Sequence, residues 1–180
     1  MSRQVYVPPI NPRQITPPSR EIYGVMGEAN IFRMMEDFYR ELEHSSLRSL
    51  FPADMVAASQ RSAAFFVGLL GGPPLYQQRY GDPMMRARHL PFVITPRARE
   101  EWLACFERVL AEAPQRYAFP EEHLAGFRAF LQGFSMWMVN TEDEGSPPAP
   151  NIGGQYEVRG SPPGRADPGD ERTRSDTLAA

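Results

Sequence analysis

Apolar residues recur at steps of three and four along four stretches of this 180-residue chain, and no stretch alternates convincingly with a period of two. Residues spaced in this way share one face of an α-helix, whereas a half-buried strand has apolar residues at every second position. The repeats are Ile31, Met35, Phe38, Tyr39 and Leu42; Val56, Ala63, Phe66, Val67 and Leu70; Trp102, Phe106, Val109 and Leu110; and Leu124, Phe127, Leu131, Phe134 and Met138. The spacing predicts an all-α domain of four main helices.

Residues that favour helix ends stand beside these repeats. Thr95 followed by Pro96 predicts the start of the third helix, because threonine caps free N–H groups and proline fits the first helical position. Pro120 and the two glutamates after it predict the start of the fourth. Residues 71–74, Gly-Gly-Pro-Pro, end the second helix, because glycine forms the left-handed cap and proline cannot continue. A short lead-in helix is expected over residues 22–26.

The segment between the second and third helices, residues 71–96, is rich in proline and glycine. It also contains a dense set of polar and aromatic residues: Tyr76, Arg79, Tyr80, Arg86, Arg88 and His89. We expect little regular structure here. Long irregular connections of this kind usually carry function.

Both ends of the chain differ in composition from the middle. Residues 1–20 are rich in proline and lack apolar periodicity, and residues 141–180 are rich in glycine, proline, serine, aspartate and arginine. Such segments bury too little apolar surface to offset the entropy lost on ordering. We therefore expect a disordered arm over 1–20, one folded domain over 21–140 and a disordered tail over 141–180.

Composition excludes several classes of protein. The net charge of −3 and the pI near 5.7 argue against nucleic acid or an anionic membrane as partner, since both would select a basic surface. No apolar run is long enough to cross a bilayer, and none at the N-terminus resembles a secretory signal, so a cytoplasmic protein is expected. The single cysteine, Cys105, cannot form an internal disulfide framework and is expected to be an inert buried thiol.

His89 is the candidate metal ligand. Arg86 and Arg88 flank it, and the apolar residues 90–94 follow. A neutral imidazole beside two cations and an apolar wall suits an iron porphyrin, whose two propionates the guanidinium groups would hold. A basic turn followed by a buried strand-like segment explains the same residues, and the residues alone leave that alternative open. The other histidines, His44 and His123, are expected to be solvated.

Three longer runs resemble group II truncated haemoglobins: residues 65–76, residues 81–94 and the sequence Trp-Leu-Ala-Cys at 102–105. The similarity begins upstream at Phe38-Tyr39 and ends near residue 140, so it covers the expected domain and neither end. The resemblance implies a two-over-two helical sandwich with haem b between its layers.

The resemblance also implies a role for each matching residue. His89 matches the iron ligand on the proximal side of the haem, and Phe51 matches an aromatic residue packed on the ring. Arg61, Arg88 and Tyr76 lie where the family contacts the propionates. These five residues form the expected cofactor site.

The expected distal site, where a small ligand would bind the iron, consists of Tyr39, Trp102, Ala58 and Ser62. Tyr39 and Trp102 match a hydrogen-bonding tyrosine and tryptophan, although aromatics on apolar helix faces are more often core residues. Ala58 and Ser62 replace larger side chains that are frequent in the family. The distal hydrogen-bond network is therefore expected to be thinner than in relatives.

The function that follows is reversible binding of dioxygen or another small ligand, such as carbon monoxide or nitric oxide, at a haem iron. The alternative is a redox enzyme that removes peroxide or nitric oxide. The acid nearest to His89 in sequence is Asp82, so we expect a backbone carbonyl as the partner of the imidazole and only modest peroxidase activity. A haem-free globin that regulates or binds other proteins is the weakest alternative. The sequence leaves open whether a reductase serves the chain and whether it is a monomer or a homodimer.

Overall fold

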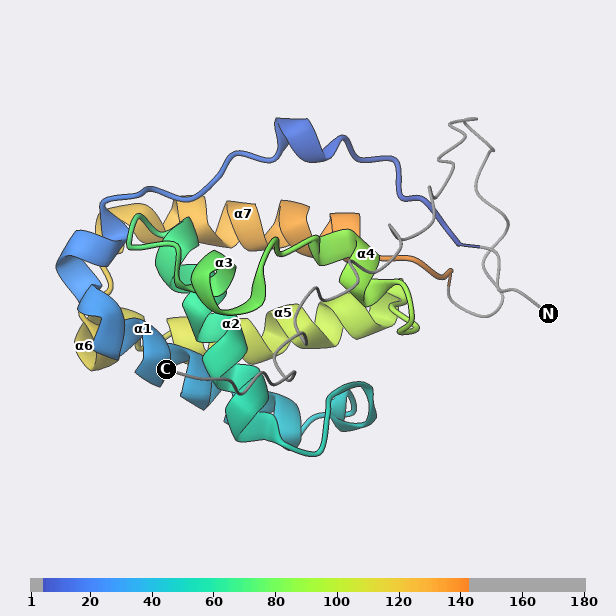
Figure 1. Ribbon diagram of the computed structural model, residues 1–180, viewed down its shortest axis with the longest axis horizontal. Coiled ribbons are helices and arrows are strands. Elements are labelled where there is room, and N and C mark those ends of the chain that lie inside the picture. Colours follow the sequence, from blue (N-terminus) through green and yellow to red (C-terminus); the bar gives the residue numbers. More distant parts are fainter. Residues whose placement is uncertain (1–4, 143–180) are drawn as a thin grey trace, which may run out of the picture. The chain divides into compact units, whose positions relative to one another are not determined.

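The computed structural model describes residues 5–142, which fall within one compact unit, Met1–Pro148. The described residues contain helices and no strand, which confirms the all-α prediction (Figure 1). The α-helices are α1 (Ile22–Glu43), α2 (Met55–Leu69), α3 (Leu75–Tyr80), α4 (Met85–His89), α5 (Pro96–Leu110), α6 (Ala113–Tyr117) and α7 (Glu121–Met138). Two 3-10 turns, Pro12–Gln14 and Arg48–Leu50, complete the set.

The four long helices pack as two pairs. Helix α1 packs on α2, and α5 packs on α7. Contacts between α1 and α5 join the two pairs, and the short α3 and α4 lie against α2 and α7 respectively (Figure 1). This is the expected two-over-two sandwich, in which the space between the layers can hold a flat cofactor.

The ends of the helices follow the local chemistry of the sequence. The Thr95 hydroxyl accepts a hydrogen bond from the N–H of Ala98 at 3.1 Å, and Pro96 begins α5. Gly71 follows the end of α2 with φ 110°, and a Cβ atom there would lie 1.9 Å from the Arg20 carbonyl oxygen. Glycine is therefore required where the chain passes residue 20. Gly27, with φ 73°, kinks α1 and separates the expected lead-in helix from the rest.

Two expectations about this region need correction. Val56 belongs to the apolar repeat, but it is 66% exposed, because its side of the first turn of α2 faces solvent; its neighbour Met55 is buried instead. Residues 71–96 are also more regular than expected, since they contain α3 and α4. Helix α3 is fixed by tertiary packing, with Tyr76 buried against α2.

The N-terminal segment 5–20 lies along α7, where the sequence predicts a disordered arm (Figure 1). The Tyr6 N–H donates to the Asn140 carbonyl at 3.0 Å, and Ile15 lies so close to Gly133 that an added Cβ would be 3.1 Å from its side chain. Proline explains the difference: a proline-rich segment has few unfolded conformations to lose, so few contacts suffice to order it. The expected tail lies outside the described residues from position 143 onward.

Candidate functional site

A cavity of about 500 Å³ lies between the two helical layers. Ligand pockets in proteins commonly have volumes of about 300–1,000 Å³. All the site residues expected from the sequence line this cavity: Tyr39, Phe51, Ala58, Arg61, Ser62, Tyr76, Arg88, His89 and Trp102. The structure thus brings together residues from α1, α2, α3, α4, α5 and the turn before α2.

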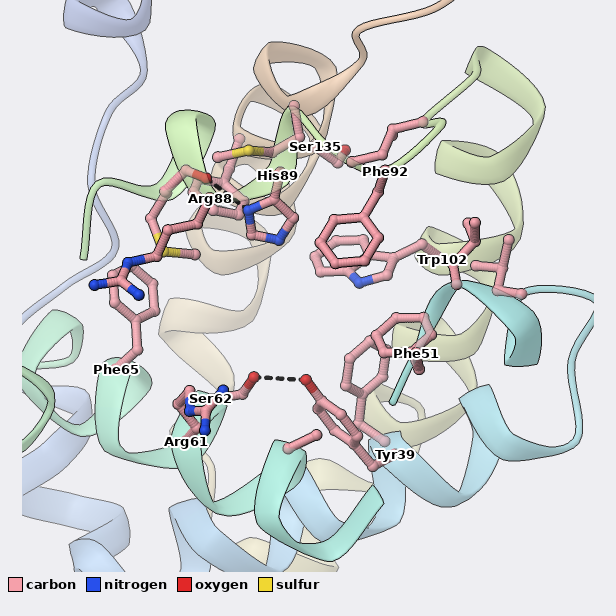
Figure 2. A pocket seen from close by; sticks show the side chains of 18 of the residues that line it. Tyr39, Phe51, Arg61, Ser62, Phe65, Arg88, His89, Phe92, Trp102 and Ser135 are labelled. Carbon is pink, nitrogen blue, oxygen red and sulfur yellow. Dashed lines mark hydrogen bonds between the residues drawn. The ribbon is translucent and has the colours of Figure 1, made fainter. Parts of the chain in front are cut away.

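The remaining wall of the cavity is mainly apolar. Phe65 from α2 and Phe92 from the segment after α4 contribute to it (Figure 2), as do Phe134 and Met138 from α7. None of these four residues was expected at the site from the sequence. Phe134 and Met138 have the spacing of core residues, and nothing local distinguishes a side chain that faces a cavity from one that packs in the core.

His89 is the last residue of α4, and its ring projects into the cavity (Figure 2). Its Nδ1 lies 2.6 Å from the carbonyl oxygen of Met85. A carbonyl can only accept, so Nδ1 carries the proton and donates it. In the neutral ring the lone pair is therefore on Nε2, the atom available to a metal. The expected backbone carbonyl partner is confirmed.

No group of three or more His, Cys, Asp or Glu side chains that could hold a metal ion occurs among residues 5–142. One imidazole nitrogen is too few ligands for a bare structural metal such as zinc, which takes four.

Tyr39 and Ser62 face His89 from the opposite side of the cavity (Figure 2). The Tyr39 hydroxyl and the Ser62 Oγ are 2.6 Å apart. Burial raises the pKa of the Tyr39 phenol, and the Ser62 hydrogen bond and the Arg61 charge oppose this only in part. Tyr39 is therefore a protonated donor at neutral pH.

Trp102 lies on α5 beside the same space, with its ring held edge-on by Phe38 and Phe106 at centroid distances of 5.5 and 4.7 Å. Its indole nitrogen turns toward the cavity (Figure 2). A ligand in the cavity could accept a hydrogen bond from this N–H.

Two arginines stand at the rim of the cavity. The Arg61 guanidinium lies 5.2 Å from the centre of the Tyr80 ring, and Arg88 reaches the carbonyls of Tyr80 and Asp82 at 3.5 and 3.3 Å. Neither side chain forms an ion pair within the described part of the chain, although both are exposed. The rim therefore offers positive charge to an anionic group at the mouth.

Arg86 does not join this rim, which corrects the expectation that it would pair with Arg88 at the cofactor. Residues two positions apart on a helix do not share a face. The Arg86 guanidinium instead donates to the carbonyls of Trp137, Val139 and Tyr6. Arg99, which was not expected at the site, lines the cavity and donates to the Ser135 hydroxyl at 3.1 Å.

The other histidines and the cysteine lie away from the cavity. His44 is exposed, and His123 lies 3.2 Å from the Glu21 carboxylate. Cys105 is fully buried, and burial raises the pKa of its thiol, as expected of an inert residue. Among the described helices none is long and apolar enough to cross a membrane.

Comparison with known proteins identifies relatives of this arrangement. The profile of the bacterial-like globin family matches residues 21–139. Group 2 truncated hemoglobin YjbI of Bacillus subtilis is 40% identical over 86 residues, which cover 47% of this chain and 65% of that protein. Two-on-two hemoglobin-3 of Arabidopsis thaliana is 32% identical over 96 residues, covering 51% and 55% of the two chains. The matched segments thus span less than two thirds of these relatives.

Solved structures extend the match. The crystal structure of phosphate-bound Hell's gate globin IV superposes with a TM-score of 0.67 at 34% identity, covering 76% of this chain and 84% of that one. The group II truncated hemoglobin of Bacillus anthracis gives a TM-score of 0.62 at 32% identity, covering 72% and 97%. These structures share the two-over-two fold described above.

Proposed function

The chain belongs to the bacterial-like globin family, as a truncated haemoglobin of group II, and is thus a haem-binding globin; on this premise we propose that His89 ligates a haem iron at which dioxygen or a similar diatomic gas binds reversibly. The observation that carries the proposal is the tautomer of His89. Its Nδ1 proton is engaged by the Met85 carbonyl, which leaves the Nε2 lone pair to the cavity.

The residues present fit haem. The cavity is mainly apolar, as a porphyrin requires, and its volume of about 500 Å³ lies within the usual range for ligand pockets. Phe51 and Phe92 offer ring surfaces for packing, while Arg61 and Arg88 offer charge for two propionates. None of the described residues that line the cavity is an aspartate or a glutamate.

When bound, ferrous haem supplies an open coordination position for a diatomic ligand. On the side opposite His89, the Tyr39 hydroxyl and the Trp102 indole act as hydrogen-bond donors to that ligand. Toward a ligand that carries partial negative charge, as bound dioxygen would, each donor would contribute about 1.5–3 kcal/mol, the range of hydrogen bonds to charged groups. Carbon monoxide is a poorer acceptor. The distal residues therefore favour dioxygen.

The partner of His89 separates this function from the redox alternative. Strong peroxidase chemistry benefits from a carboxylate that accepts the second imidazole proton and makes the ligand more basic. Here the acceptor is the neutral Met85 carbonyl. We therefore expect modest peroxidase activity and place reversible ligand binding first.

The test is the absorption spectrum of the purified full chain, oxidised, reduced and under carbon monoxide, for the wild type and His89→Ala. We expect a haem spectrum in the wild type and loss of stable haem in the variant, with helical circular dichroism retained. His44→Ala is the matched control, because His44 makes the same hydrogen bond, from Nδ1 to the carbonyl four residues earlier at 2.7 Å, but lies outside the cavity. Full haem content in His89→Ala would overturn the ligand assignment.

A further inference from the structure

Asn140 is a buried polar residue just beyond the end of α7, and its side chain is only 1% exposed. The amide makes three hydrogen bonds to the backbone of residues 89–94, the end of α4 and the segment after it. Its Nδ2 donates to the carbonyls of His89 and Phe92, both at 3.1 Å, and its Oδ1 accepts from the N–H of Ile94 at 3.1 Å. Only one orientation of the amide satisfies all three groups.

The backbone of Asn140 extends this contact. Its N–H donates to the Ile94 carbonyl at 3.0 Å, and its own carbonyl accepts from the Tyr6 N–H at 3.0 Å. The residue thus joins the end of α7, the segment 89–94 and the N-terminal arm. Hydrogen-bonded groups on three segments restrict the position of the His89 backbone.

Arg86 links the beginning of α4 to other parts of the chain. Its guanidinium reaches the carbonyls of Trp137 and Val139 at the end of α7, and that of Tyr6 at 3.0 Å. Helix α4 has only five residues, and Met84 before it adopts φ 38°, which is uncommon for a residue other than glycine. A helix this short is not stable by itself and depends on packing against other elements. Its position is therefore set by these contacts with α7.

We propose that Asn140 is the positioning residue of the proximal ligand, which fixes the His89 backbone so that Nε2 meets the iron in one orientation. This rests on the proposed function of His89. Two hydrogen bonds act together. The bond to the Met85 carbonyl sets the rotation of the His89 ring, and the bond from Asn140 sets the position of the His89 backbone. Loss of the amide leaves the ring its local hydrogen bond but frees the backbone to move.

The test compares the wild type with Asn140→Ala and Asn140→Asp in the haem-loaded full chain. The aspartate keeps an acceptor for the Ile94 N–H but replaces two donated bonds by repulsion between a carboxylate and two carbonyls. We expect a shifted and broadened iron–histidine stretching band in the resonance Raman spectrum of both reduced variants. We also expect haem loss to be faster by about tenfold, since buried acceptors are left unsatisfied.

Tyr117→Phe is the control for a merely structural effect. Tyr117 is fully buried and donates to the Asp37 carboxylate, so its replacement also removes a buried hydrogen bond, away from the cavity. We expect a lower melting temperature and an unchanged iron–histidine band. If Asn140→Ala lowers the melting temperature but leaves the band unchanged, Asn140 is not a positioning residue.

Hydrogen exchange in the wild type keeps the proposal testable even if the variants fail to fold. The Ile94 N–H should exchange as slowly as the core of α5, because its acceptor is buried. Fast exchange at Ile94 would contradict the proposal. Retention of haem in His89→Ala would instead contradict the proposed function, so the two failures are distinguishable.

Discussion

The two sides of the cavity are built in different ways. On the distal side Tyr39, Ser62 and Trp102 project from the long helices α1, α2 and α5, and the contact between Tyr39 and Ser62 joins two side chains. On the proximal side His89 ends a five-residue helix, and the contacts that hold it involve backbone carbonyls and the amide of Asn140. The distal side thus takes its geometry from helix packing, whereas the proximal side takes it from hydrogen bonds to the backbone.

The difference indicates which property each side controls. Distal side chains can be changed with the helices left in place, so their substitution should alter ligand preference and leave the iron–histidine bond alone. Substitutions near the proximal segment should alter that bond and leave the preference between dioxygen and carbon monoxide alone. A variant that changed both the ligand preference and the iron–histidine bond would contradict this separation of the two sides.

The largest expected distal effect is that of Tyr39→Phe, which removes one hydroxyl and retains the ring. We expect dioxygen to dissociate roughly tenfold faster, through loss of one charge-assisted hydrogen bond. Carbon monoxide dissociation should change far less. Stopped-flow or flash-photolysis kinetics on the reduced protein measure both rates, and the iron–histidine band should stay in place.

Trp102→Phe is the companion measurement, because the indole nitrogen turns toward the same cavity and is the second proposed donor. We expect a smaller acceleration in the same direction. If Tyr39→Phe leaves the dioxygen rate within about a factor of two and Trp102→Phe raises it steeply, the indole is the principal donor. The difference between the two sides would still hold after that result, with Trp102 in place of Tyr39 as the principal donor.

The distal side was predicted from the sequence through the family resemblance, which assigns roles to Tyr39, Ser62 and Trp102. The apolar period alone places Tyr39 and Trp102 on buried helix faces, where an aromatic residue is more often part of the core. The hydrogen bond between Tyr39 and Ser62 was not predicted, because it depends on how closely α1 and α2 approach each other.

On the proximal side, only the ligand His89 could be predicted from the sequence. Asn140 contacts His89 across 51 positions of sequence, and neither of its neighbours marks it as a buried residue. Arg86 and Arg88 look alike in sequence, and only the formation of α4 turns them to different sides. Backbone contacts between distant segments leave no local pattern, which is why the residues that hold α4 were missed.

Ser62→Ala sharpens the distal half of the comparison. We expect the Ser62 hydroxyl to donate to the Tyr39 oxygen, which leaves the phenol proton to the ligand. Its removal should let the phenol rotate and speed dioxygen release by about threefold, the effect of one neutral hydrogen bond. Slower release would show that Tyr39 donates to Ser62 in the wild type and that the two acceptors compete.

The rim belongs to neither side and should have a smaller effect. Arg61→Gln and Arg88→Gln remove exposed charges, and exposed ion pairs contribute at most about 1 kcal/mol. We expect haem to leave each variant about twofold faster, and the difference should shrink at high salt. Transfer of haem to an apoglobin acceptor measures the rate. Arg79→Gln, an exposed arginine that does not line the cavity, is the control and should match the wild type.

The smallest expected effect is the pH dependence of dioxygen release. Burial raises the pKa of Tyr39 above its ordinary value of 10.0, so the folded chain keeps the phenol proton at a pH where the unfolded chain has lost it. The contribution to stability is therefore complete below about pH 10 and is lost as the pH rises from there through the folded pKa. We expect a flat dissociation rate from about pH 7 to 10, since the donor stays protonated throughout.

Tyr39→Phe isolates this titration from that of Tyr117, whose pKa burial also raises. The difference in unfolding free energy between wild type and variant should stay constant up to about pH 10 and decline only above it. An inflection in the dioxygen rate near neutral pH that persists in Tyr39→Phe would place the titrating group elsewhere. If the same inflection appeared in the iron–histidine band, the group would act from the proximal side, and the independence of the two sides would fail.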